Sequence, residues 1–94
     1  MMICCDLDGT LTLETEGHDY ANRTPNIFMI HKIRQWYRHG SHIILYSARL
    51  MKIDRKITIL WLKKYHVPYH ELILGKPKAD IYIDDKARRP EEVL

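Results

Sequence analysis

Four short apolar runs, separated by segments of a different pattern, constrain the fold of this chain more than any other feature. The runs are MICC (2–5), HIILY (42–46), ELIL (71–74) and the apolar part of DIYID (80–84). Each has the length of a strand, and three of them are apolar at successive positions, which is typical of parallel strands buried on both faces. Strands that alternate with helical segments predict an α/β domain. We expect a mostly parallel sheet of about four strands with two main helices.

The two helical segments are marked by apolar spacing and by their ends. The first is predicted over about residues 25–39, because Thr24-Pro25 has the pattern of an N-cap followed by a first-turn proline. The second is predicted from the capping residue Asp54 to about His66.

The 94 residues contain no linker and no repeat, so we expect residues 1–94 to form a single domain. Within it, the polar and turn-rich residues 10–24 are expected to form a flap-like loop or a small hairpin. The formal charge of +3 is spread among negative residues and indicates anionic ligands only weakly.

No apolar run approaches the ~20 residues needed to span a bilayer, and Asp6 interrupts the apolar start of the chain. We therefore expect a soluble cytoplasmic protein with no membrane partner. Cys4 and Cys5 are adjacent on a predicted strand and so point to opposite faces, which predicts buried reduced thiols and no internal disulfide.

Residues with reactive side chains follow the end of each apolar run. They are Asp6 and Asp8 after the first run, Ser47 and Arg49 after the second, Lys76 after the third, and Asp84 and Asp85 after the fourth. Because the carboxyl ends of parallel strands meet at one edge of a sheet, we expect these side chains to converge there.

Such a set supports phosphoryl transfer at a metal ion. Four carboxylates in one cleft repel each other unless a cation holds them, and oxygen ligands favour a hard ion such as Mg²⁺. One aspartate could attack phosphorus to form an aspartyl-phosphate, and the other of the first pair could transfer protons. Ser47 and Lys76 offer a hydroxyl and a positive charge for phosphoryl oxygens, and Gly9 lets the backbone turn close to a phosphate.

Four motifs carry a resemblance to a known family. DLDGT (6–10), ILYSAR (44–49), GKP (75–77) and YIDD (82–85) resemble, in this order, the motifs of the haloacid dehalogenase-like superfamily of phosphatases and phosphotransferases. The longer stretches HVPYHELILGKP and IYIDDKARRP are similar to a small capless group associated with bacterial capsule biosynthesis. The resemblance covers nearly the whole chain and implies a minimal Rossmann-like fold without a cap domain.

The resemblance also implies roles for the acidic residues. Asp6 would be the nucleophile and Asp8 the general acid and base. Mg²⁺ would be bound by Asp6, by the backbone carbonyl of Asp8 and by Asp84, with Asp85 nearby directly or through water.

For the phosphoryl group, the resemblance implies Ser47 and Lys76 as ligands. Arg49 follows Ser47 in the motif and is expected to contact the rest of the substrate. The expected function is therefore a Mg²⁺-dependent phosphomonoesterase acting through an aspartyl-phosphate on a small-molecule phosphate ester, with a sugar phosphate favoured. A phosphorylated polymer end stays open as a substrate, whereas other nucleic-acid binding is not expected.

Two alternatives use the same residues differently. A signalling receiver domain also places acidic residues, a hydroxyl and a lysine around Mg²⁺ and a phospho-aspartate, but in another order along the chain. A catalytically idle subunit would bind phosphate or metal without turnover.

The predicted connections also bear on association. Right-handed crossovers that advance in one direction place both helices on the same face of the sheet. The other face would remain apolar and exposed, so we expect a homodimer that covers it.

Overall fold

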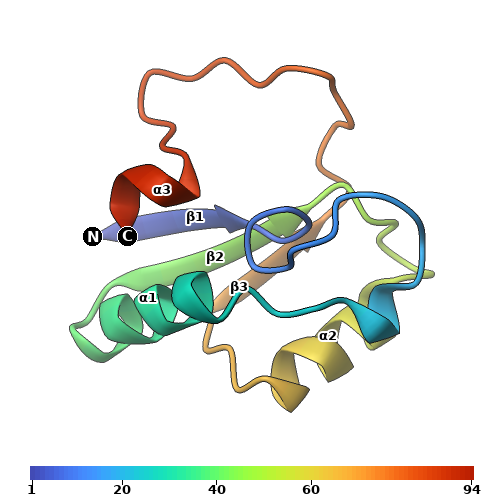
Figure 1. The fold of residues 1–94 in the computed structure, drawn as a ribbon, viewed down its shortest axis with the longest axis horizontal. Coiled ribbons are helices and arrows are strands. Elements are labelled where there is room, and N and C mark those ends of the chain that lie inside the picture. The colour runs from blue at the N-terminus through green and yellow to red at the C-terminus, as the bar shows by residue number, and fades with distance from the viewer.

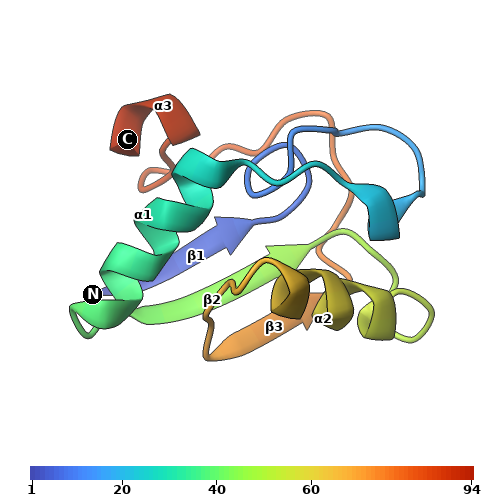
Figure 2. The ribbon, with the colours of Figure 1, turned by 60° about the horizontal axis from the view of Figure 1, so that its bottom comes forward.

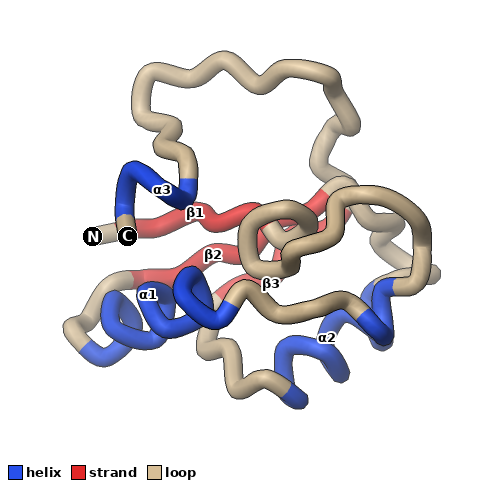
Figure 3. Tube along the Cα trace, in the orientation of Figure 1, coloured by secondary structure: helices blue, strands red, loops and turns tan.

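The computed structural model describes residues 1–94 and shows a three-stranded parallel sheet (Figures 1 and 3). The strands are β1 (Met2–Asp6), β2 (His42–Ser47) and β3 (Glu71–Leu74), in the spatial order β1-β2-β3. Their register sets Cys5 beside Leu45 and Leu45 beside Leu72. The predicted α/β class and the parallel direction of the sheet are confirmed.

Both long helices cover one face of this sheet, as the right-handed crossover rule requires (Figure 2). They are α1 (Ile27–Arg38) and α2 (Arg55–Lys64). Between them and the sheet lies a core of buried apolar side chains: Cys5, Leu7, Leu11, Met29, Ile30, Ile33, Ile43, Leu45, Trp61, Leu62, Val67, Leu72 and Leu74. A single layer of helices therefore supplies nearly all the apolar burial of the domain.

The start of α1 differs from the prediction. Asn26 is the N-cap, and its side chain accepts a hydrogen bond from the backbone N–H of Met29 at 3.4 Å. Thr24 does not cap the helix, because its N–H and its hydroxyl both donate to the carboxylate of Glu14, at 2.7 and 2.6 Å. Thr24 is therefore bound to Glu14, ten residues upstream, and the N-cap position is taken by Asn26.

The flap-like loop of residues 10–24 is anchored at both of its ends. Thr12 is fully buried and forms an isolated antiparallel bridge with Pro25. Near the other end, the indole Nε1–H of Trp61 in α2 donates to the carbonyl of Arg23 at 2.9 Å. A short 3₁₀ helix, η1 (Tyr20–Asn22), lies just before this contact. The loop is therefore a fixed wall beside the sheet.

Residues 80–84, predicted as a fourth strand, pair with no strand in the structure. Only residues 75–79 separate them from the end of β3, whereas a crossover between parallel strands needs about a dozen residues or more. The chain instead runs back outside β1 toward its beginning and ends in the short helix α3 (Pro90–Val93), as Figure 1 shows.

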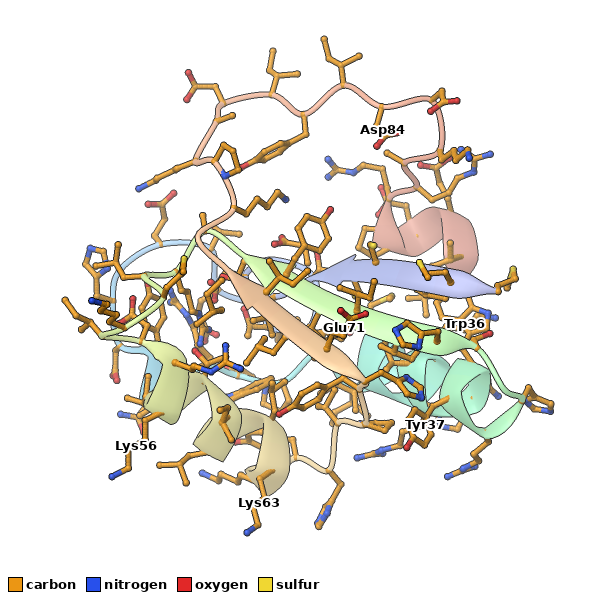
Figure 4. All side chains as sticks on the ribbon, turned by 180° about the vertical axis from the view of Figure 1, so that it is seen from behind. Trp36, Tyr37, Lys56, Lys63, Glu71 and Asp84 are labelled. Atoms are coloured by element: carbon orange, nitrogen blue, oxygen red, sulfur yellow. The ribbon has the colours of Figure 1, made fainter.

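The face of the sheet opposite α1 and α2 carries no helix and is seen in Figure 4. We call it the open face. By strand alternation its residues are Met2, Cys4 and Asp6 of β1, His42, Ile44 and Tyr46 of β2, and Glu71 and Ile73 of β3.

Cys4 is exposed on this face, whereas Cys5 is buried on the helical side, so the prediction of two buried thiols is wrong for Cys4. The reason is the missing second layer. Both cysteines are free, as predicted.

No helix in this fold combines the length and the apolar character that crossing a membrane would require.

Candidate active site

A cavity of about 620 Å³ opens at the carboxyl edge of the sheet. Each strand contributes to its lining: Asp6 ends β1 and Asp8 follows it, Ser47 ends β2 and Arg49 follows it, and Lys76 follows β3. The structure thus brings together five of the residues singled out in the sequence. The remaining wall is largely the flap-like loop, including Tyr20 and Arg23.

Asp8 is held by Arg49 in a bidentate ion pair. Nε of Arg49 donates to Oδ2 at 3.0 Å and Nη2 donates to Oδ1 at 2.7 Å. The remaining Nη1 donates to the hydroxyl of Thr58 in α2 at 2.9 Å, and Arg49 is only 3% exposed. The guanidinium expected to contact substrate is therefore committed to orienting Asp8.

A second arginine, Arg23 of the flap-like loop, approaches the same carboxylate. Its Nε lies 3.3 Å from Oδ1 of Asp8, and its two Nη atoms donate to the backbone carbonyls of Glu16 and Gly17. Together with Arg49, it gives the ion-pair cluster one net positive charge, which favours an anionic ligand. Sequence reasoning missed Arg23, because a lone basic residue in a polar loop carries no recognisable signal.

The aromatic ring of Tyr20 covers this cluster. The guanidinium carbon of Arg49 lies 4.0 Å from the ring centroid, and that of Arg23 lies 5.2 Å from it. Burial, and then the negative charges of Asp54 and Asp8, raise the pKa of the Tyr20 hydroxyl. The ring shields the Asp8–Arg49 pair from water and so strengthens it.

Asp6 stands apart from the arginines and faces Lys76. The Lys76 Nζ lies 3.8 Å from Oδ1 of Asp6 and sits between two aromatic rings, 4.1 Å from the centroid of Tyr46 and 3.9 Å from that of Tyr82. Burial raises the pKa of the Asp6 carboxyl, and the charge of Lys76 lowers it by less than burial raises it. Asp6 is therefore a poorly solvated carboxylate with one cation beside it.

Ser47 and Gly9 are placed differently with respect to the cavity. Ser47 lines it, is 1% exposed, and accepts a hydrogen bond on Oγ from the backbone N–H of Arg49 at 3.1 Å. Gly9 is not part of the lining, and its N–H donates to the hydroxyl of Thr12 at 3.2 Å. Its positive φ of 83° and the closeness of Thr15 explain the glycine structurally, because an added Cβ would lie 2.6 Å from Thr15 Cγ2.

Asp84 and Asp85 do not join the cavity at the carboxyl edge. Both are exposed on the segment outside β1, and Asp84 accepts a hydrogen bond from the backbone N–H of Lys86. That bond is the main reason why the pKa of Asp84 lies below its usual value. Asp85 borders a separate cavity of about 480 Å³ along the outer edge of β1, which it shares with Asp6.

The expected cluster of four carboxylates is therefore not formed. Nowhere in the structure do three or more histidine, cysteine, aspartate or glutamate side chains gather as metal ligands. The cause is the short connection after β3, which does not place residues 80–84 in the sheet as a further parallel strand.

The fold is shared with an experimentally determined structure. A crystal structure of an MCSG target from Vibrio cholerae matches 98% of this chain and 85% of its own length, at 35% identity and a TM-score of 0.90. This chain belongs to that protein's family.

A second match is more distant. A chain in the structure of a Pnkp1/Rnl/Hen1 complex matches 87% of this chain at 28% identity and a TM-score of 0.68, but only 29% of its own length is covered. No protein-family model and no curated protein matches the sequence.

Proposed function

We propose that this protein is a phosphomonoesterase of the haloacid dehalogenase-like type that forms an aspartyl-phosphate at Asp6. The observation that carries the proposal is the pairing of Asp6 with Lys76 inside a cavity in which Asp8 is held by two arginines. The two carboxylates have different partners, and paired carboxyl groups in different environments can take different chemical roles.

In the first step, an Oδ atom of Asp6 attacks phosphorus while the bond between phosphorus and the ester oxygen breaks. The leaving oxygen takes a proton from Asp8 or from water. Lys76 supports the negative charge on the phosphoryl oxygens, since it is held in place by two aromatic rings, and the hydroxyl of Ser47 lies in the same cavity.

In the second step, a water molecule attacks the phosphorus of the aspartyl-phosphate, and its bond to Asp6 breaks. The water gives up a proton to Asp8. Asp8 lines the same cavity as Asp6, and Arg49 holds its carboxylate in a fixed orientation, so Asp8 is the side chain placed to take this proton. Esters with a good leaving group, which need no proton in the first step, should therefore react fastest.

Of the paired carboxylates Asp6 and Asp8, Asp6 is the one that fits a magnesium ion. Asp6 is poorly solvated, and its pKa is raised, so a cation beside it would be favourable. Asp8 is occupied by Arg23 and Arg49. Mg²⁺ commonly takes one or two carboxylates and completes its shell with water and phosphate oxygens, so Asp6 suffices as the protein side chain. When bound, the ion would reduce the repulsion between Asp6 and the phosphoryl group.

The proposal includes the haloacid dehalogenase-like fold and a cytoplasmic protein that acts on small sugar phosphates. The polar lining supports a polar alcohol as leaving group, since Glu16, His18 and Lys78 lie around the cavity. The similarity to capsule-associated phosphatases supports a sugar phosphate.

The test is phosphate release by the purified protein. We expect hydrolysis of p-nitrophenyl phosphate with Mg²⁺, its loss with EDTA, and its loss in Asp6→Asn. Asp80→Asn, an exposed aspartate outside the cavity, is the matched control and should retain activity. A panel of sugar phosphates, nucleotides and 3′-phosphorylated oligonucleotides then ranks the substrates.

Three outcomes contradict the proposal. Folded, Mg²⁺-loaded protein that releases no phosphate from any ester would favour a binding subunit. Stable phosphorylation by acetyl phosphate without turnover would favour a receiver domain. Full activity in Asp6→Asn would exclude this nucleophile.

A further inference from the structure

The positive charge of the protein is concentrated on the side of the sheet that carries α1 and α2. Residues 27–66, which include both helices and β2, contain nine lysines and arginines and one acidic residue, whereas the rest of the chain contains six basic and eleven acidic residues. Of the nine cations, only Arg49 forms an ion pair, with Asp8. The charge that the composition spreads over the chain is therefore separated in the fold, and the resulting field attracts an anionic partner.

The outer side of α2 and the turn before it mix lysines with aliphatic side chains. Lys56, Leu60 and Lys63 follow one another at helical spacing on one stripe of α2, and the opposite stripe is buried through Trp61 and Leu62. Figure 4 shows Lys56 and Lys63 pointing away from the sheet. We call this surface the basic face. It consists of Lys52, Ile53, Lys56, Leu60, Lys63 and Lys64.

The aliphatic members of the basic face are strongly exposed. Ile53 is 77% exposed and Leu60 is 55% exposed, and in the adjoining turn Leu50 and Met51 are 58% and 63% exposed. Aliphatic side chains that lie in water among lysines gain most from a partner that is both anionic and apolar. A nucleic-acid backbone would match the lysines but not these side chains, whereas the surface of an anionic bilayer accommodates both.

We propose that the basic face binds the surface of a bilayer that contains anionic phospholipids. The lysines would lie among the headgroups, and Ile53 and Leu60 would enter the boundary between headgroups and acyl chains. The acidic residue of this segment, Asp54, is engaged within the turn, where its Oδ2 accepts the backbone N–H of Leu50 at 2.8 Å. Such contact needs no spanning segment, so it departs from the expectation of no membrane partner, which rested on the lack of one.

Binding through the basic face also bears on the cavity at the carboxyl edge. Leu50 and Asp54, next to the beginning of this face, line that cavity. A bound protein would therefore hold the cavity close to the lipid surface. The inference concerns a surface outside the reacting groups and holds whether or not the protein is a phosphatase.

Co-sedimentation of the purified chain with lipid vesicles tests the proposal. The wild type should bind vesicles of phosphatidylglycerol and phosphatidylcholine in equal parts, should not bind vesicles of phosphatidylcholine alone, and should lose affinity as the salt concentration rises. Lys63→Glu should lower the partition coefficient by about tenfold or more, because it replaces an attractive charge by a repulsive one. Lys86→Glu is the matched control: it makes the same change in net charge at an exposed position outside β1, and its partition coefficient should stay within about threefold of the wild type.

A second pair of variants separates a lipid surface from a nucleic acid. Ile53→Ser should lower vesicle binding by about fivefold or more, whereas Ile81→Ser, at a residue 75% exposed on the segment after β3, should leave it unchanged. Circular dichroism verifies that each variant is folded.

Three outcomes overturn the proposal. The first is wild-type protein that does not bind the anionic vesicles, and the second is an equal loss of binding in Lys63→Glu and Lys86→Glu. The third is vesicle binding that Ile53→Ser leaves unchanged. If a single-stranded oligonucleotide then binds the wild type and is lost in Lys63→Glu, the basic face is a nucleic-acid surface instead.

Discussion

Replacing Arg49 tests whether the ion pair with Asp8 organises the cavity. Arg49→Met removes two hydrogen bonds to the carboxylate and one to Thr58. Loss of one partner of a buried ion pair costs about 3–5 kcal/mol. The Asp8 side chain is 21% exposed and keeps Arg23 at 3.3 Å, so we expect the low end, about 3 kcal/mol of unfolding free energy. For a domain of this size, this loss lowers the melting temperature by roughly 12–24 °C.

Arg49→Lys separates the charge from the geometry. A lysine keeps the positive charge but cannot form the bidentate contact and the bond to Thr58 together, so we expect a loss of about 1–2 kcal/mol. Urea unfolding and thermal melting followed by circular dichroism measure both variants. Arg38→Met, at an exposed position of α1, is the control and should stay within about 0.5 kcal/mol of the wild type. An Arg49→Met protein as stable as this control would refute the reasoning.

Three further predictions concern single side chains. Because burial raises the pKa of the Asp6 carboxyl above its ordinary 3.8, the folded state disfavours the charged form, so Asp6→Asn should stabilise the protein at neutral pH. This gain in stability should vanish below pH 3.8, where the Asp6 carboxyl is protonated in both the folded and the unfolded protein. A gain that persists below pH 3.8 would show that burial of the charge is not its cause. Gly9→Ala should lower the unfolding free energy by about 2–3 kcal/mol, because Gly9 has a positive φ and the added Cβ would clash with Thr15. Gly17→Ala is the control: Gly17 has a similar φ, but no atom lies near its added Cβ, so this variant should lose only about 1 kcal/mol. Trp61→Phe leaves the buried backbone carbonyl of Arg23 without its hydrogen-bond donor, so the unfolding free energy measured in urea should fall by about 1–3 kcal/mol. A variant as stable as the wild type would show that water replaces the indole N–H.

Part of the fold follows from local pattern. The three strands lie within a residue of the predicted runs, because short apolar β-branched segments have few other stable placements. The direction of the chain then places Asp6, Ser47 and Lys76 at one edge of the sheet. The cap of α1 was predicted wrongly, since Glu14 binds Thr24 and leaves the cap to Asn26.

The roles of the basic residues depend on contacts between distant parts of the chain. Arg49 is 41 residues from Asp8 in sequence, and nothing near either residue indicates a bidentate pair. Arg23 reaches the same carboxylate only because the flap-like loop is tied to Trp61 on α2. Long-range hydrogen bonds of this kind have no periodicity that a sequence can display.

The sequence by itself determined the class of the domain, the parallel direction of its strands and the edge at which the first five reactive residues meet. Those outcomes rest on periodicity and chain direction, which are local properties. Only the tertiary structure decided that Asp8 is bound by two arginines while Asp6 faces Lys76, and that Asp84 and Asp85 lie outside β1. The physical reason is that ion pairing depends on distance in space, and the route of the last segment depends on the few residues available to cross the sheet.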